Sequence, residues 1–175
     1  MIDDSIYQRM IKKKFEVEDD DHSQAFSHRP PRPDVDGKGN IYIIGLDGSG
    51  KSDLAENLAK ELDKKFVVVG DGGVTPRDAS EADNTVFAVM EDGFGNPEDL
   101  VLCRKSGKVL YLMAEQMDVI NTLVAAGNDE EKVRADLAQK RESFEPLFML
   151  MLHFIVQGGR SKDELLQDGL EKARL

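Results

Sequence analysis

The sequence predicts an α/β domain in which a five-stranded parallel sheet lies between two layers of helices. Two observations support this fold class. Short apolar segments recur from residue 40 onward, and longer amphipathic segments alternate with them along the chain. Because helices that connect successive strands return the chain to the same edge of the sheet, this alternation predicts parallel strands and a doubly wound arrangement.

Five short, mostly apolar segments are predicted to be the strands. The first, "NIYIIG", is continuously apolar, which is typical of a strand buried on both faces of a parallel sheet. The segments, in chain order, are residues 40–45, 65–70, 84–90, 108–113 and 152–157.

The segments between the strands carry helix patterns and helix end signals. Residues 51–65 place Leu54, Leu58 and Leu62 on one stripe. Residues 96–107 begin with a capping Asn and a first-turn Pro and end at a Gly. Two further helices are predicted over residues 115–126 and 129–148, and a Ser161 to Glu164 capping box opens the last one.

Residues 1–39 differ from the rest of the chain and are predicted to form a flexible or partly helical arm and linker. Acidic and basic blocks are followed by "HRPPRPDVDGKGN", in which prolines preclude a helix and glycines loosen the chain. A short helix over "SIYQRMIKKKFEV" would be marginal in isolation. The domain itself is predicted to comprise residues 40–175.

Composition narrows the range of partners. The chain has 175 residues and a formal net charge of -11, which argues against nucleic acid and anionic membranes as general partners. Cys103 is the only cysteine, so an intrachain disulfide is excluded. No apolar run approaches the roughly 18 residues of a membrane span. We expect a cytoplasmic protein, and the sequence does not identify a protein partner.

A phosphate-binding motif lies between the first predicted strand and the first predicted helix. "GLDGSGKS", residues 45–52, satisfies the Gly-x-x-x-x-Gly-Lys-[Ser/Thr] pattern known as Walker A. Its glycines let successive N–H groups converge on phosphate oxygens at the helix N-terminus. Lys51 would neutralise the β- and γ-phosphates, and Ser52 would place its hydroxyl on Mg²⁺. The fold expected is therefore a three-layer P-loop NTPase fold, with ATP and Mg²⁺ as cofactors.

The candidate nucleotide-binding residues all come from this motif, and they are Gly45, Gly48, Ser49, Gly50, Lys51, Ser52 and Asp53. Two aspartates have alternative interpretations. Asp47 could reach a substrate hydroxyl or a magnesium water, or it could be a solvated turn residue. Asp71 follows the second strand, near the sheet edge where sites form, but an Asp-Gly turn is the favoured interpretation. His153 is expected to be a packed core residue.

Three segments together resemble shikimate kinase and related small P-loop kinases. "NIYIIGLDGSGKSDLAENLAKELDKKF" is similar to the family's opening strand, phosphate loop, helix and second strand. "NPEDLVLCRKSGKVLYLMAEQMDVINTL" is similar to a later helix, strand and helix, and "EPLFMLMLHFIVQGG" resembles the Pro-Leu-Tyr segment and last strand. The phosphate loop also resembles that of thymidylate kinases, in which an acidic residue at the position of Asp47 contacts the sugar of the nucleotide.

The resemblance implies catalytic residues, and several positions depart from the family pattern. The aspartate pair after the second strand is missing, so Asp71 is the displaced candidate. Glu91 and Asp92 occupy most of the family's triple-glycine turn, which should repel the carboxylate of shikimate. The position of the family's substrate-binding arginine corresponds to Phe144 here, and Arg141, one helical turn earlier, is a possible substitute. The family's arginine-bearing lid over the ATP phosphates is shortened in this chain, and Arg134 is the candidate for its arginine.

Two functions from different classes follow. The first is an ATP-dependent kinase of a small hydroxylated metabolite, with Lys51, Asp71, Asp47, Arg134 and Arg141 as candidate catalytic residues and Ser52 as the metal ligand. The second is a catalytically degenerate relative that acts as a nucleotide-binding or regulatory protein. A thymidylate-like nucleoside monophosphate kinase is a minor alternative.

Overall fold

The computed structural model describes residues 35–175. The helix predicted within residues 1–39 and most of the predicted arm lie outside this range. The last residues of the predicted arm that are described contact the domain, because the Asp36 N–H donates to Lys105 O at 2.7 Å and Lys38 Nζ donates to Ser80 O at 2.9 Å. The exact division between arm and domain stays a prediction.

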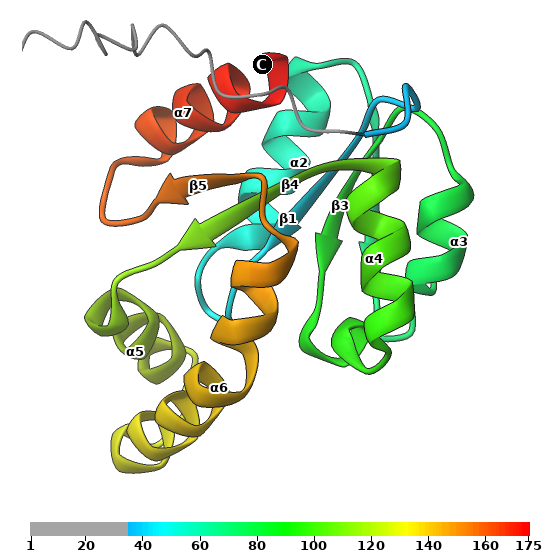
Figure 1. The fold of residues 1–175 in the computed structure, drawn as a ribbon. Coiled ribbons are helices and arrows are strands. Elements are labelled where there is room, and N and C mark those ends of the chain that lie inside the picture. Colours follow the sequence, from blue (N-terminus) through cyan, green and yellow to red (C-terminus); the bar gives the residue numbers. More distant parts are fainter. Residues whose placement is uncertain (1–34) are drawn as a thin grey trace, which may run out of the picture. The chain divides into compact units, whose positions relative to one another are not determined.

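Five parallel strands form one sheet in the order β2-β3-β1-β4-β5 (Figure 1). In chain order the strands are β1 Asn40–Ile44, β2 Lys65–Val69, β3 Thr85–Val89, β4 Gly107–Met113 and β5 Phe154–Gln157. The central strand β1 is buried at all five residues. The predicted α/β class, the P-loop NTPase fold and all five strands are confirmed.

Six α-helices and one 3-10 helix connect or follow the strands in the described part of the chain. They are α2 Lys51–Glu61, α3 Pro76–Glu81, η1 Glu91–Phe94, α4 Pro97–Ser106, α5 Gln116–Ala125, α6 Glu130–Met151 and α7 Lys162–Arg174. The predicted caps are present: Asn96 Oδ1 accepts from the Glu98 N–H at 3.1 Å, and Ser161 with Glu164 forms a capping box. Helix α3 was not predicted from the sequence, and its N-cap Thr75 accepts from the Asp78 N–H at 3.2 Å.

Two apolar clusters fill the spaces between the layers. One lies between the sheet and α3, α4, α5 and α6, and it includes Tyr42, Phe87 and Phe148. The other lies between the sheet and α2 and α7, and it includes Ile43, Leu58 and Leu170. Because successive residues of a strand point to opposite faces, β1 supplies both clusters, and this fixes the phosphate loop at its carboxyl end between the two helical layers.

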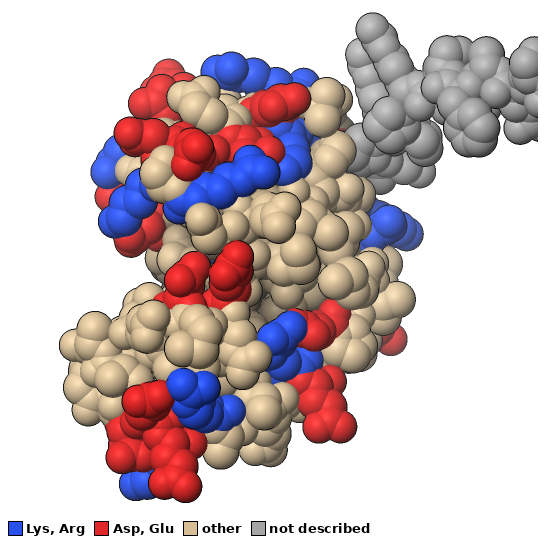
Figure 2. All heavy atoms as spheres, turned by 90° about the vertical axis from the view of Figure 1, so that its left-hand side faces the viewer, with Lys and Arg blue, Asp and Glu red and all other residues tan. Residues whose placement is uncertain are grey.

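No helix of residues 35–175 is long and apolar enough to cross a bilayer. The face drawn in Figure 2 carries Lys and Arg interspersed with Asp and Glu rather than a continuous basic surface. The expected cytoplasmic location stays a prediction.

Candidate functional site: a phosphate loop and its charged neighbours

The loop between β1 and α2 has the backbone of a phosphate cradle. Gly48 and Gly50 have φ angles of 81° and 86°, in the left-handed region that favours glycine. A Cβ on Gly48 would lie 3.0 Å from Leu123 Cγ, because α5 packs against the loop. Gly50 is the N-cap of α2 and makes no side-chain cap bond. Because glycine has no side chain that could accept from them, the first N–H groups of α2 can donate to an anion.

Lys51 is held inside this loop by a carboxylate. Its side chain is only 4% exposed, and its Nζ lies 2.6 Å from Asp47 Oδ1. The backbone N–H of Asp47 in turn donates to Glu91 Oε1 at 3.3 Å. The carboxylates of Asp47 and Glu91 thus accept hydrogen bonds from two donors of the phosphate loop, Lys51 Nζ and the Asp47 N–H. A bound phosphate would accept from these donors instead.

A second lysine reaches the same carboxylates from α6. Lys140 Nζ lies 2.8 Å from Glu91 Oε2, 3.4 Å from Asp136 Oδ2 and 3.9 Å from Asp47 Oδ2. Burial by itself would lower the pKa of Lys140, but the hydrogen bond and charge of Glu91, with Asp136 and Asp47, outweigh it and raise the pKa. Lys140 is therefore cationic at neutral pH. Sequence reasoning missed it because one lysine in a highly charged helix gives no motif.

A cavity of about 710 Å³ opens beside the loop. Its wall includes the loop itself, Asp118 and Thr122 of α5, and the segment between β5 and α7 from Gly158 to Arg160. An ion pair between Asp53 and Lys162, with 3.2 Å between Oδ2 and Nζ, links the starts of α2 and α7 beside it. The cavity has the size of a small-molecule site and adjoins the phosphate cradle.

Every candidate nucleotide-binding residue except Gly45 lines this cavity. Gly45 does not line it, and a Cβ at Gly45 would approach Leu112 O to 2.9 Å. Ser52 follows Lys51 in the first turn of α2, so its hydroxyl lies beside the loop. Residues 35–175 contain no group of three or more His, Cys, Asp or Glu side chains suited to a metal. This donor set fits Mg²⁺ only in the manner in which it usually binds nucleotides, through few protein oxygens and the phosphates.

The structure places Asp71 away from this cavity. Asp71 is exposed, has a φ of 50°, and its N–H donates to Asp92 Oδ2 at 2.7 Å. The Asp-Gly turn therefore exists, braced by the residue that follows Glu91. Its role in catalysis stays untested.

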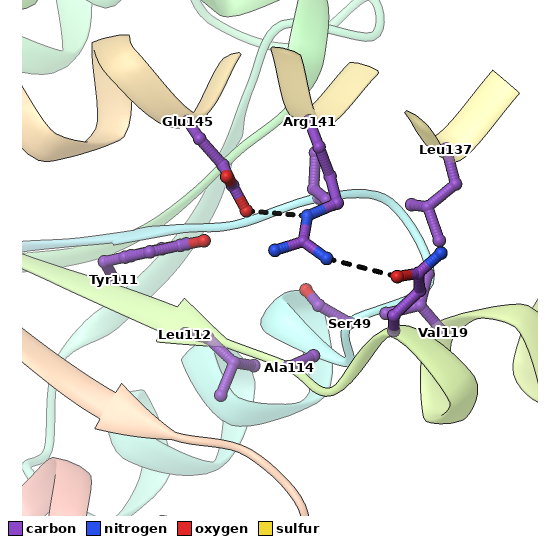
Figure 3. Close-up of a pocket in the computed structure, with 10 residues that line it drawn as sticks. Ser49, Tyr111, Leu112, Ala114, Val119, Leu137, Arg141 and Glu145 are labelled. Carbon is purple, nitrogen blue, oxygen red and sulfur yellow. Dashed lines mark hydrogen bonds and ion pairs between the residues drawn. The ribbon is translucent and has the colours of Figure 1, made fainter. Parts of the chain in front are cut away.

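The two candidate arginines are both engaged by neighbouring side chains. Arg134 is exposed and pairs with Glu130 at 2.8 Å within α6. Arg141 donates to Glu145 Oε1 at 2.8 Å, as Figure 3 shows. It also donates to Gln116 Oε1 at 3.4 Å. Arg141 thus lines a small cavity on the α6 side of the loop rather than the large one.

Ser49 connects this small cavity to the phosphate loop. Its Oγ is buried and has no hydrogen-bond partner among the described residues. In Figure 3 the hydroxyl points toward the space below the Arg141 guanidinium. The small cavity on the α6 side of the loop is therefore lined by polar groups, the Ser49 hydroxyl and the Arg141 guanidinium. Glu145 and Gln116 hold that guanidinium in position.

His153 is half-buried between α6 and β5 and belongs to neither apolar cluster, so it is a hydrogen-bonded residue at the rim of the core rather than the packed core residue that was expected. Its ring Nδ1 accepts from the Val109 backbone N–H at 2.9 Å, and the backbone N–H of His153 donates to Val109 O at 2.9 Å. Burial, with a smaller contribution from Arg104, lowers the pKa of His153 to about 4. The neutral ring links the end of α6 to β4 and lines neither cavity at the loop.

Comparison with known proteins gives sequence relatives of one kind. No protein-family profile matches the chain. Shikimate kinase of Nitrosomonas europaea is 26% identical over 170 residues, which covers 78% of this chain and 79% of that protein. Shikimate kinase of Burkholderia thailandensis is 24% identical over 150 residues, covering 69% and 82% respectively.

Solved structures agree on the fold. Shikimate kinase of Bacteroides thetaiotaomicron superposes with a TM-score of 0.65 at 16% identity, covering 78% of this chain and 98% of that one. Shikimate kinase of Acinetobacter baumannii, in complex with shikimate, gives 0.60 at 18% identity and covers 75% and 90%. The YorR protein of Bacillus subtilis, in complex with phosphorylated GDP, gives 0.56 at 19% identity and covers 78% and 96%.

The fold and the loop between β1 and α2 define the class, a protein with the P-loop NTPase fold. Within this class the chain is shikimate kinase-like, because the sequence relatives reported above are shikimate kinases and the solved structures that share its fold include shikimate kinases. The resemblance predicted from the sequence is confirmed at this level.

Proposed function

We propose that this chain binds ATP with Mg²⁺ at residues 45–52 and transfers the γ-phosphoryl group to a small hydroxylated metabolite. One observation carries the proposal: a buried lysine, Lys51, lies in a left-handed glycine loop at the N-terminus of α2, beside a cavity of about 710 Å³. Shikimate kinase relatives use ATP chemistry of this type, and the fold is the same.

The roles follow from charge and position. The uncapped N–H groups of α2 would hold phosphate oxygens, and Lys51 would release Asp47 and neutralise the β- and γ-phosphates. Ser52 would hold Mg²⁺ together with those phosphates. In the transfer, the bond from the γ-phosphorus to the bridging oxygen breaks and a bond to the acceptor oxygen forms. The hydroxyl proton of the acceptor passes to solvent, and ADP leaves.

The charges around the loop favour an acceptor without a carboxylate. Glu91 and Asp92 follow β3, where the family resemblance implies that the carboxylate of shikimate would bind. Both are engaged in the fold: Glu91 by Lys140 and the Asp47 N–H, and Asp92 by the Asp71 N–H. Negative charge at this position raises the energy of a bound anion, so a neutral or cationic polyol is the better substrate class.

A second candidate is a protein that binds nucleotide without transferring phosphate. Asp71 lies in an exposed turn, and Arg134 is paired with Glu130 away from the loop. Phosphoryl transfer depends on charge stabilisation, and one arginine can be worth about 10³ to 10⁵ in rate. Binding needs only the cradle and Lys51, so it would survive the loss of these groups.

A nucleotide acceptor is the remaining alternative. The Bacillus subtilis neighbour was solved with phosphorylated GDP, and the loop resembles that of thymidylate kinases at Asp47. Asp47 is engaged by Lys51, so a nucleotide sugar would first have to displace that contact.

The test is a coupled assay of ADP release. Mg-ATP is offered with shikimate, with neutral polyols, with amino polyols and with nucleoside monophosphates in parallel. The proposal predicts release above background with a polyol and none with shikimate. ATP binding without release for any acceptor would support the nucleotide-binding candidate, and release with a nucleoside monophosphate would support the third.

A further inference from the structure

Two lysines share one carboxylate at the mouth of the phosphate loop. Asp47 Oδ1 accepts from Lys51 Nζ at 2.6 Å, and its second oxygen lies 3.9 Å from Lys140 Nζ. Lys51 comes from the start of α2 and Lys140 from the middle of α6, on the other side of the loop. An anion between two ammonium groups has the surroundings that a phosphoryl group requires.

Lys140 differs from the candidate arginines in the ion-pair and hydrogen-bond partners that orient its side chain. Arg134 is exposed and forms its ion pair within its own helix, and Arg141 is directed into the small cavity by Glu145 and Gln116. The ammonium of Lys140 is directed to the loop by Glu91, whose other oxygen accepts from the Asp47 backbone N–H. Its side chain is only 31% exposed, so its charge is screened less than that of a free surface lysine.

We propose that Lys140 is a phosphate-binding residue of this site, which exchanges Glu91 and Asp47 for the terminal phosphoryl group of a nucleoside triphosphate. The inference rests on the proposed function, since it requires a nucleotide in the loop. Lys140 then supplies from α6 the positive charge that the resemblance assigned to an arginine. A flexible ammonium suits the exchange, because it carries three donors and no fixed geometry.

The assignment makes a distinction between ATP and ADP. A contact to the terminal phosphoryl group stabilises bound ATP and leaves bound ADP nearly unaffected. Hydrogen bonds to charged groups contribute about 1.5 to 3 kcal/mol, so Lys140→Met should weaken ATP binding about tenfold or more relative to ADP. Lys132→Met removes the same charge from an exposed position of the same helix and serves as the matched control.

Removing Lys140 also leaves Glu91 without its ion-pair partner, although the Asp47 N–H still donates to it, and the uncompensated carboxylate would itself repel ATP. The double variant Lys140→Met with Glu91→Gln separates the two causes. If Lys140 contacts phosphate, ATP binding stays weak in the double variant. If Lys140 only neutralises Glu91, the double variant recovers the affinity of the parent protein.

The experiment is calorimetric titration of the full chain with Mg-ATP and Mg-ADP, with circular dichroism to confirm that each variant is folded. The expected result is a selective loss of ATP affinity in Lys140→Met and in the double variant, with Lys132→Met unchanged. Equal losses for ATP and ADP, recovery in the double variant, or no change in Lys140→Met would each overturn the assignment. Failure of the parent protein to bind either nucleotide would instead overturn the proposed function.

Discussion

Replacing Asp47 with asparagine should tighten nucleotide binding, although Asp47 lies inside the binding loop. Its carboxylate lies 2.6 Å from Lys51 Nζ, so ATP must compete with it for that ammonium. Asp47→Asn keeps the size of the side chain and removes the competing charge. It also removes the repulsion between a carboxylate and the phosphates once ATP is bound.

The expected gain in ATP affinity follows from the strength of the ion pair between Lys51 and Asp47, which depends on how exposed the two side chains are. Two unit charges about 4 Å apart interact by about 4 kcal/mol at an effective dielectric constant of about 20. Lys51 is 4% exposed but Asp47 is 45% exposed, so solvent screens much of this energy. Exposed pairs contribute about 0.2 to 1 kcal/mol, and a value of about 1 kcal/mol fits this half-exposed case. ATP should therefore bind about fivefold more tightly.

The assay is titration of both proteins with Mg-ATP at low and high salt. Asp163→Asn is the matched control, since it makes the same chemical change at an exposed aspartate in the first turn of α7 that does not line the cavity beside the loop. We expect the control to change affinity less than about twofold. Unchanged or weaker ATP binding in Asp47→Asn would refute the competition argument and favour a direct role of Asp47 in holding the ligand.

Three further predictions concern the fold around the site. Gly48→Ala forces an alanine to φ 81° and brings a Cβ to within 3.0 Å of Leu123. It should lower the free energy of unfolding, measured by chemical denaturation, by about 1 to 3 kcal/mol and should weaken ATP binding. The control Gly127→Ala, at φ 95° in open space, should lower the stability without changing ATP binding. Burial lowers the pKa of His153 in the folded protein to about 4 from its usual 6.5, so between these pH values the unfolded chain binds the proton preferentially. The free energy of unfolding should therefore fall as the pH drops from about 6.5 to 4, by about 1 to 2 kcal/mol after solvent screening. His153→Gln should flatten this part of the plot of stability against pH. Burial raises the pKa of the Cys103 thiol to about 12, so alkylation at pH 8 should require unfolding; rapid labelling of the folded protein would contradict its burial.

Local patterns were sufficient to predict the strands and most helices. Continuous apolar runs mark strands that are buried on both faces, and capping residues such as Asn96 and Ser161 mark helix starts. The short helix α3 was missed because six residues offer little periodicity, although Thr75 and Pro76 carried a capping signal.

The site was predictable only where one segment contains it. The phosphate loop is continuous in sequence, so its residues and their surroundings could be read directly. The contacts of Lys140 with Glu91 and Asp47 join three separate segments, and neither periodicity nor spacing can indicate them. The partners of Arg134 and Arg141 likewise depend on helix packing and side-chain direction, which only the structure supplies.

The central claim is that the loop at residues 45–52 binds a nucleoside triphosphate through Lys51. Calorimetric titration with Mg-ATP, carried out on the parent protein and on Lys51→Ala in the same buffer, tests it most directly. The structure leads us to expect saturable binding at one site in the parent and a loss of about a hundredfold or more in Lys51→Ala, because a buried charged contact to phosphate is removed. Equal binding by both proteins, or no binding by the parent at millimolar ATP, would contradict it.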